Sequence, residues 1–412
     1  MKKFLTAVIF LLSLSSFACA ENYGQLADNE PPRNLSTSVD AFCWKYFATL
    51  NLDENIFYSP YGINAALSIL ANGASGDTLK EIIFALEADN VDNLNECHQN
   101  FSESVARKYH GDNLFMESDL LLIDKKIIGR GLNENFKRVV TDIYQSDVRE
   151  ADFENNLRGE QQKISQWVSD KTSGFIPNYN SIVNENTLTD LLNVVYFKGK
   201  WAMPFKSSNT STQDFKNRDG SVSRVDMMSK IFDEKITYRE NDKYKGIELP
   251  YSDNAAMYLI MPVDNSLNVA ESWNNETPNY RASFLDGLKY SSAFRGEVVV
   301  CLPKFELDIE NSLVASLKAM GIKKSFTGDA EFFNIVNDTS LKIDNAKHRA
   351  KIKVDEQGTE AAAITEITLN ETCAPIDEPP RRVYFIADKP FLLVIKDIES
   401  NVTLFAGVVN KL

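Results

Sequence analysis

Hydrophobic and polar residues alternate with two periods along the chain, and these predict a mixture of helices and strands. Apolar residues recur every three or four positions over residues 37–50, which predicts an amphipathic helix with one face on the core. The same spacing predicts further helices at residues 63–71, 95–108, 133–145 and 160–172. The capping-box pattern from Thr78 to Glu81 predicts the start of another helix after residue 71.

Short apolar runs bounded by turn residues predict strands. They lie at residues 55–60, 191–197, 247–251, 257–261 and 297–302. Near the C-terminus, the apolar runs 391–395 and 402–409 flank a polar turn and predict a hairpin buried on both faces. No Gly/Ser linker, repeat or low-complexity block divides the chain, so the mixture favours one α+β unit.

One stretch near the C-terminal end combines the pattern of a buried strand with that of an exposed loop. From residue 359, one set of alternate positions is uncharged and mostly small: Thr359, Ala361, Ala363, Thr365, Ile367 and Leu369. Because successive strand side chains point to opposite faces, one face of this segment is fit for burial. Acidic, proline-bearing sequence follows from Pro375, as in an exposed loop. The pattern fits a segment that moves, or an ordinary partly buried strand followed by a long loop.

The N-terminal residues have the pattern of a secretory signal peptide. Residues 1–20 contain Lys2 and Lys3, an apolar run too short for a membrane anchor, and a small-x-small site ending at Ala20. A bacterial lipoprotein signal modified at Cys19 is a less favoured alternative. Residues 21–36 are polar and predict a flexible tail. We therefore expect a secreted, extracellular protein with no membrane-spanning segment.

The charge of the chain narrows the possible partners. The 412 residues include 44 basic and 58 acidic side chains, for a formal net charge of -14, which argues against nucleic acid or an anionic membrane. Hydrophobic residues make up 43% of the chain, enough for a large core. Asn-x-Ser/Thr sequences are candidate glycosylation sites of a secreted glycoprotein, at Asn34, Asn100, Asn209, Asn275, Asn337, Asn370 and Asn401.

Four cysteines remain beyond residue 20: Cys43, Cys97, Cys301 and Cys373. Their spacing is too wide for a zinc knuckle or a CxxC redox centre. They could form disulfides in an oxidising compartment, but four cysteines are too few to be the framework of a chain this long. Cys373 lies in the loop-like segment, where it is either a reactive thiol or incidental.

The search for catalytic chemistry finds no enzyme motif. There are three histidines, and GxSxG, HExxH, Walker and dinucleotide patterns are missing from the sequence. No cofactor or metal site is predicted, and an enzyme that uses His348 is the least favoured alternative. The basic pairs at residues 107–108 and 125–126 fit solvated faces better than a polyanion site.

Five groups of residues resemble the serpins, a family of serine protease inhibitors, and occur in the family's order. They are Asn55 to Pro60, Asn193 with Phe197 to Phe205, Leu302 to Phe305, His348 to Ala363, and Pro390-Phe391 with Leu404 to Gly407. The resemblance covers residues 37–412. It implies a single domain with three β-sheets, about eight or nine helices and an exposed reactive-centre loop at about residues 356–384.

The resemblance also implies a mechanism and site residues. A target serine protease attacks the loop as a substrate, and the cleaved loop inserts as a strand into the central sheet before the acyl-enzyme hydrolyses. The hinge of the loop would comprise Glu356, Gly358, Thr359, Glu360, Ala361, Ala362 and Ala363. Ser59, Asn193 and His348 match the family's shutter and Trp201 its breach, whereas Gly62 departs from the family's usual serine.

The scissile bond is implied less directly. Counting from Glu356 places it between Thr372 and Cys373, whereas counting back from Phe385 places it nearer Ile376, so the loop carries an insertion. Thr372 would suit an elastase-like protease.

Other positions would suit other proteases. Leu369 would suit a chymotrypsin-like enzyme, while Arg381 or Arg382 would suit a trypsin-like one but lie close to the following strand. We expect a monomer. The alternative function is a non-inhibitory serpin acting as a carrier, storage protein or chaperone. Such members commonly carry proline or bulky charged residues in the hinge, and the inward set here has none, which favours an inhibitor.

Overall fold

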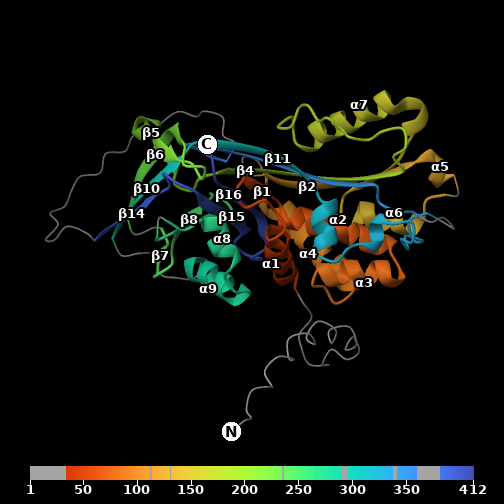
Figure 1. Cartoon of the computed structure of the whole chain (residues 1–412), viewed down its shortest axis with the longest axis horizontal. Coiled ribbons are helices and arrows are strands. Elements are labelled where there is room, and N and C mark those ends of the chain that lie inside the picture. Colours follow the sequence, from red (N-terminus) through yellow and green to blue (C-terminus); the bar gives the residue numbers. More distant parts are fainter. Residues whose placement is uncertain are drawn as a thin grey trace, which may run out of the picture.

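The computed structural model describes residues 34–110, 114–129, 131–233, 236–264, 266–289, 296–336, 341–359 and 381–412. Within these ranges the chain forms three β-sheets and ten α-helices (Figure 1). The helices are α1 (Leu35–Phe47), α2 (Pro60–Gly73), α3 (Gly76–Ala85), α4 (Val91–Lys108), α5 (Lys125–Ile128), α6 (Glu134–Asp142), α7 (Phe153–Lys171), α8 (Val269–Asn274), α9 (Pro278–Lys289) and α10 (Val314–Ala319). The predicted α+β class and three sheets are confirmed.

The central sheet is long and carries helices on both faces. Its strand order is β11 (Phe305–Ser312), β12 (Asn345–Val354), β13 (Gly358–Thr359), β4 (Thr189–Lys200), β2 (Leu114–Asp124) and β3 (Asp147–Ala151). Helix α7 lies over one face, and the group that includes α2, α3, α4 and α6 lies under the other (Figure 1). The sheet is therefore enclosed along the half that holds β3.

A second sheet contains the C-terminal hairpin. Its order is β1 (Ile56–Tyr58), β16 (Thr403–Val409), β15 (Phe391–Asp397), β9 (Ala255–Pro262), β8 (Tyr244–Pro250) and β7 (Tyr238–Glu240). Every residue of β15 and β16 is buried, as the sequence predicts for an inner hairpin.

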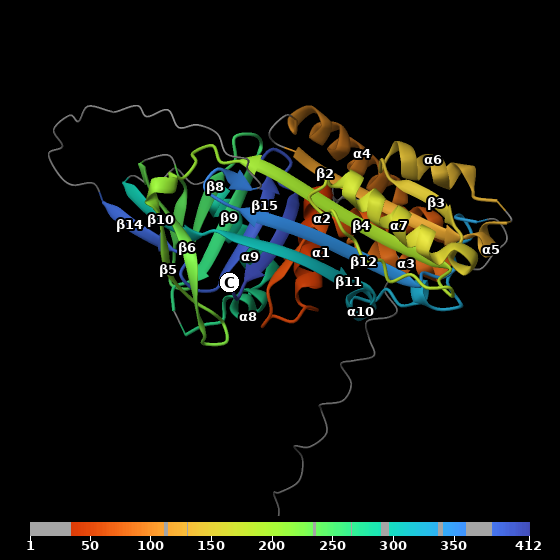
Figure 2. The ribbon, with the colours of Figure 1, turned by 90° about the horizontal axis from the view of Figure 1, so that it is seen from above.

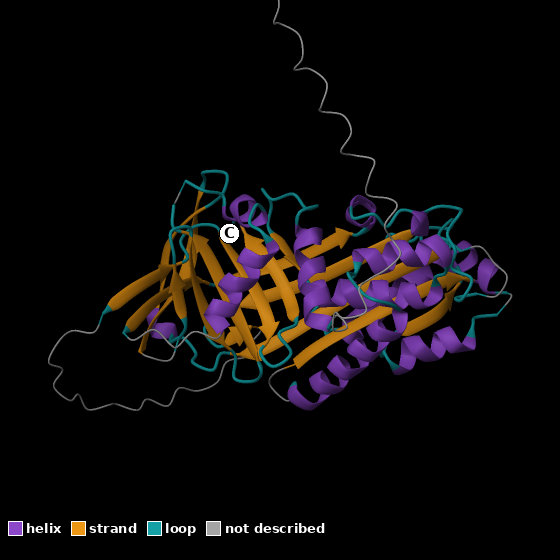
Figure 3. Ribbon diagram, turned by 90° about the horizontal axis from the view of Figure 1, so that it is seen from below, coloured by secondary structure: helices purple, strands orange, loops and turns teal. Residues whose placement is uncertain are grey.

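The third sheet lies at the end of the molecule away from α5 and α6 (Figures 2 and 3). It comprises β14 (Arg382–Ile386), β10 (Glu297–Pro303), β6 (Val222–Asp233) and β5 (Thr210–Lys216). Strand β14 is the edge strand and pairs with β10 in parallel. It begins at Arg382, so the last residues of the predicted reactive loop, 382–384, form part of a strand of the third sheet.

Helix α2 occupies the centre of the core. Ser59 is its N-cap and accepts a hydrogen bond from the N–H of Gly62 (3.0 Å), and Pro60 takes the first position, where its missing N–H costs nothing. All but one of its residues are buried, because it runs beneath the central sheet rather than on the surface. The position of Ser59 under the sheet follows from this cap.

The predicted capping box is wrong. Helix α3 begins earlier, with Ser75 at the N-cap, so Thr78 lies inside the helix. The carboxylate of Glu331 accepts a hydrogen bond from the N–H of Thr78 (3.2 Å) and takes the capping role from a distant segment. Glu81 accepts hydrogen bonds from the backbone of residues 323–324 instead (2.7 Å each). A remote carboxylate thus replaces the local cap.

The predicted signal peptide, residues 1–20, lies outside the described residues, as does most of the predicted tail, residues 21–36. Helix α1 begins at Leu35, inside the range predicted as tail. In the ranges that the structure describes, no helix combines the length and apolar character that a bilayer span requires.

Candidate functional site

The hinge residues Gly358 and Thr359 form strand β13, which lies between two strands of the central sheet. Thr359 pairs with Val354 of β12 on one side and with Gly199 of β4 on the other, and both pairings are antiparallel. Gly358 pairs with Lys200. The beginning of the predicted loop therefore already separates β12 from β4 at this end of the sheet.

Close packing explains the glycine in this strand. A Cβ on Gly358 would lie 2.1 Å from the carbonyl oxygen of Gly199, so no larger residue fits. The hydroxyl of Thr359 is 2.7 Å from the hydroxyl of Tyr251, and Thr359 is only 1% exposed. Thr359 therefore points to the buried face, as the alternation in the sequence requires.

Trp201 holds the turn that precedes β13. Its backbone N–H donates to the carbonyl of Gln357 (2.9 Å), and its indole N–H donates to the carbonyl of Asp355 (3.0 Å). The indole is stacked on the ring of Tyr251, with centroids 4.6 Å apart. Trp201 thus holds the turn and also forms, with Tyr251, the apolar floor under Thr359. An inserting strand would enter at this place.

Glu356 is anchored rather than free. Its carboxylate forms an ion pair with the ammonium of Lys304 (3.0 Å) and accepts a hydrogen bond from the hydroxyl of Thr210 (2.8 Å). Burial alone would raise the pKa of Glu356, but these contacts lower it below its usual value. Its carbonyl also accepts from the N–H of Phe205 (2.8 Å). Of the predicted hinge, Glu356 is therefore a fixed point that joins the central sheet to the third sheet.

Farther from the hinge, β12 and β4 pair directly and in parallel, from Asn345–Asp190 to Ala350–Val195. His348 and Asn193 face each other in this ladder, and their side chains meet at 2.6 Å. The N–H of Ser59 donates to Nε2 of His348 (2.9 Å). Nδ1 must then carry the proton and donate to Asn193, which defines the neutral tautomer. The three predicted shutter residues are brought together.

This arrangement differs from a catalytic nucleophile and base. Ser59 gives its backbone N–H to His348, while its hydroxyl donates to the carbonyl of Leu404 (2.6 Å). Burial lowers the pKa of His348 to about 3, and the residue is fully buried. His348 therefore links α2 to the two central strands as a neutral donor and acceptor.

The family model described as "Serpin (serine protease inhibitor)" matches residues 37–412. The chain belongs to the serpin family. It is 29% identical to Iripin-1 of Ixodes ricinus over 87% of this chain and 90% of that protein. It is 30% identical to a protein of Mus musculus that is named as a serine protease inhibitor, over 91% of this chain and 83% of that protein. The structure of human thyroxine-binding globulin complexed with thyroxine is also similar, with a TM-score of 0.78 and 25% identity over 92% of this chain and 98% of that one.

The shutter of this serpin contains two carboxyl groups that were not predicted. The amide Nδ2 of Asn193 donates to Glu117 (2.8 Å) and to Asp119 (2.9 Å), both on β2. Burial and mutual repulsion raise the pKa of Glu117, and burial raises that of Asp119. Two buried carboxyls this close share a proton instead of both ionising. Acidic residues two apart in an otherwise apolar strand were the signal available in the sequence.

The surroundings of Asn193 also explain why glycine fits at position 62, where the family usually has serine. A Cβ there would lie 2.5 Å from Cγ2 of Val195 and 2.7 Å from Oδ1 of Asn193, so the place of the usual serine side chain is filled. Asn193 finds its further partners on β2 instead. In the predicted shutter, the amide of Asn193 therefore has two carboxyl groups of β2 as its partners.

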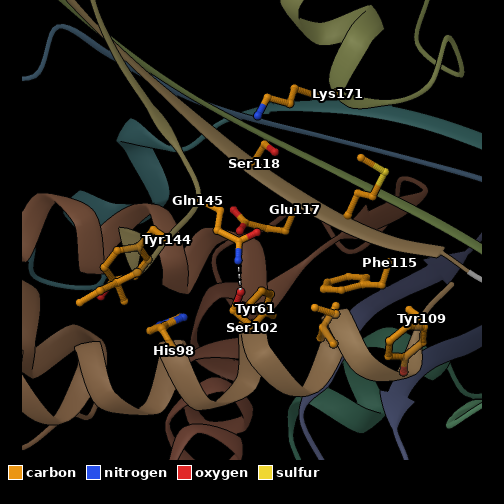
Figure 4. A pocket seen from close by; sticks show the side chains of 14 residues that line it. Tyr61, His98, Ser102, Tyr109, Phe115, Glu117, Ser118, Tyr144, Gln145 and Lys171 are labelled. Atoms are coloured by element: carbon orange, nitrogen blue, oxygen red, sulfur yellow. Dashed lines mark hydrogen bonds between the residues drawn. The ribbon is translucent and has the colours of Figure 1, made fainter. Parts of the chain in front are cut away.

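Glu117 also lines a cavity of about 260 Å³ beside the sheet, together with Tyr61, His98 and Tyr144 (Figure 4). Strand β3 pairs only with the second half of β2, from Leu120 onward, so the first half of β2 is a free edge among the described strands. The cavity lies at this edge. Of the two carboxyl groups, Glu117 thus borders the cavity, whereas Asp119 is buried.

The other predicted positions are distributed over the surface or lie outside the described residues. Asn34, Asn100, Asn209 and Asn275 are exposed, and Asn401 is half-buried. Asn337 and Asn370 lie outside the described residues, as do Glu360, Ala361, Ala362, Ala363 and the predicted bond between Thr372 and Cys373.

Among the described cysteines, Cys43, Cys97 and Cys301 form no disulfide with one another. Cys43 is buried against the hydroxyl of Tyr58 (3.3 Å), and burial raises the pKa of its thiol. Cys373 lies outside the described residues. The disulfides that the sequence left open are thus not formed among the three cysteines that the structure describes.

The basic residues that the sequence analysis named form ion pairs or backbone hydrogen bonds. Arg382 forms an ion pair with Glu297 across the β14–β10 ladder, and the carbonyl of Arg381 accepts from the N–H of Glu297 (2.9 Å). Lys108 pairs with Glu399 (2.8 Å), and Lys126 pairs with Glu154 (2.9 Å). These contacts fit solvated or structural roles.

Proposed function

We propose that this serpin is a secreted inhibitor of serine proteases that acts as a suicide substrate. The serine oxygen of the protease attacks the carbonyl carbon before the scissile bond, the peptide bond breaks, and the new amino group takes up the proton. An ester to the protease remains on the loop. Insertion of the loop between β12 and β4 then traps the ester before water hydrolyses it.

The observation that carries this proposal is the position of β13. It is antiparallel to both neighbours and lies in the gap that an inserting strand would fill. A chain that continued from Thr359 in the same direction would run between β12 and β4 toward His348 and Asn193. Insertion would extend an existing strand, which avoids the cost of starting a new one.

The hydrogen bonding of the sheet also favours insertion of the loop between β12 and β4. Insertion would break the direct parallel ladder between β12 and β4 and form an antiparallel ladder on each side of the new strand. Two ladders replace one, and antiparallel pairing is slightly more stable per residue. The buried positions after Thr359 would be filled by Ala361, Ala363 and Thr365, which bury no charge.

The proposed target is a protease of the elastase-like or chymotrypsin-like class. Thr372 suits a shallow specificity pocket, and Leu369 suits a deeper apolar one. Arg381 and Arg382 are less suitable for a trypsin-like enzyme, because their backbone is engaged beside β10 and Arg382 is paired with Glu297. A protease needs an extended, unpaired segment.

The test is to mix the protein separately with neutrophil elastase, chymotrypsin and trypsin. A denaturing gel should show a band at the summed mass with elastase or chymotrypsin, and the first residue of the released C-terminal peptide should locate the bond. Cleavage without such a band would refute the inhibitory mechanism. Expression in a secreting cell tests the export part, with a mature N-terminus at Glu21 as the expected result.

A carrier function is the second candidate, because the structural relatives include a globulin that carries thyroxine in its crystal structure. The two functions differ in what cleavage does. An inhibitor should gain thermal stability when its loop is cut, since the inserted strand completes the sheet. A serpin whose loop does not insert should show no gain.

A further inference from the structure

Three lysines from different parts of the chain converge on one hollow between the second and third sheets. The hollow has a volume of about 530 Å³ and is lined by Lys216 at the end of β5, Lys245 at the start of β8 and Lys389 after β14. The N–H of Lys216 donates to the carbonyl of Asp388 (2.8 Å), which fixes the Lys389 segment against β5. The lysines therefore meet because the chain returns here from the third sheet to β15.

The hollow holds charged side chains of both signs. Arg218, which also lines it, is paired with Asp53 (3.0 Å) and Glu271 (3.2 Å). Asp388 and Asp264 are the carboxylates that act on Lys389. Lys216, Lys245 and Lys389 thus share the hollow with Asp388, in a protein whose net charge is -14.

The protonation of Lys389 reflects this crowding. Burial, followed by the charge of Lys245, lowers the pKa of Lys389, with Lys216 acting in the same direction. A bound anion would offset both the lost hydration and the repulsion between the ammonium groups. The negative charge of the protein as a whole would not attract an anion, so binding here would depend on these local groups.

The lining also includes a group of apolar and aromatic side chains, beside the polar residues Asn217, Ser266 and Asn268. Tyr384 and Leu267 are 54% and 45% exposed, and they lie with Ile386 and two prolines on the same hollow. A site with a cationic cluster beside an apolar rim suits a ligand with one anionic group on an apolar body. A volume of about 530 Å³ is enough for a ligand with a fused ring system.

We propose that this hollow binds a small organic anion, of the aryl phosphate or aryl sulfate class. The anionic group lies among Lys216, Lys245 and Lys389, and the ring lies against Tyr384 and Leu267. The site is separate from the hinge and the shutter, and it does not depend on protease inhibition.

Calorimetric titration of the full chain with 1-naphthyl phosphate tests the proposal. We expect a dissociation constant below about 1 mM, with 1-naphthol and inorganic phosphate each binding at least about tenfold more weakly. Equal binding of naphthol would overturn the role of the lysines. Equal binding of inorganic phosphate would overturn the role of the apolar rim, and no binding of naphthyl phosphate would overturn the site.

Matched variants locate the binding. Lys245→Met and Lys389→Met should each weaken naphthyl phosphate binding about tenfold or more, as the loss of a charge-assisted contact predicts. Lys137→Met makes the same charge change on α6, at the other end of the molecule, and should have no effect (Figure 1). If all three variants weaken binding alike, a general charge effect replaces the site.

Lysine acylation followed by mass spectrometry measures the binding of naphthyl phosphate in the protein without any substitution. Naphthyl phosphate should slow acylation of Lys389 at least threefold and leave Lys137 unchanged. Binding without protection of Lys389 would place the ligand elsewhere and refute the proposal.

Discussion

The two ends of the gap between β4 and β12 differ in what fills it. At one end β13 separates the strands, and Trp201, Tyr251 and Thr359 form a tight, largely apolar floor. At the other end the strands pair directly, and a polar chain from Ser59 through His348 to Asn193 crosses beneath them. The same pair of strands is therefore already apart at one end and joined at the other.

The difference shows how one sheet can be both stable and able to open. Hydrogen bonds in the polar chain can be exchanged for others when the strands part, whereas an interlocked apolar core would have to lose its packing. The apolar floor lies at the end where β13 already separates β4 from β12. Under the proposed mechanism, these two strands do not have to separate further there. Four changes, ordered by expected effect, test this comparison.

Thr359→Arg should have the largest effect, because it places a charge at a position that is 1% exposed. An unpaired buried charge costs about 3–5 kcal/mol, which is enough to expel β13 from the gap. The fold should remain, but the number of inhibitor molecules consumed per trapped protease should rise about tenfold or more. Titration of protease activity measures this ratio.

Glu360→Arg is the matched control, since the next residue of a strand points to the opposite face. It should leave the ratio near its original value. If Thr359→Arg trapped protease as efficiently as the unchanged protein, strand insertion would not be the mechanism.

Asn193→Ala should have the next largest effect, at the closed end. His348 would lose the acceptor for its Nδ1–H, and both carboxyls of β2 would lose a donor. Unsatisfied buried groups of this kind predict a loss of about 3 kcal/mol in the free energy of unfolding, measured by urea denaturation.

Asn180→Ala makes the same truncation on an exposed loop and should change the free energy of unfolding by less than about 0.5 kcal/mol. Similar losses for the two variants would contradict the role given to the polar chain.

Asp119→Asn should change how stability depends on pH. The raised pKa of the carboxyl pair means that its contribution is complete below the unfolded value of about 4 and is lost as the pH rises through the folded value. From about pH 4 to pH 7 the free energy of unfolding of the unchanged protein should therefore fall by at least about 1 kcal/mol more than that of the variant, measured by denaturation.

The buried histidines are the same in both proteins, so their contribution cancels in this comparison. Burial lowers the pKa of His348 and of His98 to about 3, so their stability contribution is lost only as the pH falls below about 6.5. Parallel pH profiles for the two proteins between pH 4 and pH 7 would show that the carboxyls do not share a proton.

Lys304→Met should have the smallest effect. It removes the ion pair to Glu356 at the open end but keeps an apolar stem, and the lysine side chain is 37% exposed. The expected loss is no more than about 1 kcal/mol, with protease trapping unchanged. Lys342→Met, which breaks a comparable pair with Asp344, is the control. A loss of trapping in Lys304→Met alone would mean that Glu356 has to be held for insertion.

Sequence patterns were informative where one face of a segment dominates its composition. The spacing of apolar residues predicted α1 and α4, and the run at the C-terminus predicted the buried hairpin. Motifs in the family's order identified Ser59, Asn193, His348 and Trp201, and the structure brings the first three into one hydrogen-bonded chain. Their partners on other elements could not be read from local spacing.

Three findings show what the sequence did not reveal. The cap of α3 comes from Glu331, far along the chain, and the floor under Thr359 comes from Tyr251. Glu117 and Asp119 lie two apart in a mostly apolar run, but their shared partner Asn193 is found only when β2 is placed beside β4. Each depends on tertiary contacts, which sequence spacing does not encode.

The pairing of β1 with β16 sets the order in which this protein can be completed. Ile56 lies opposite Val408, so a strand made early in synthesis finds its partner only in the last residues of the chain. Such long-range pairing is slow to form. Until β15 and β16 have been made, β1 and β9 each lack a neighbour in the second sheet. Strand edges left unpaired in this way are prone to aggregation.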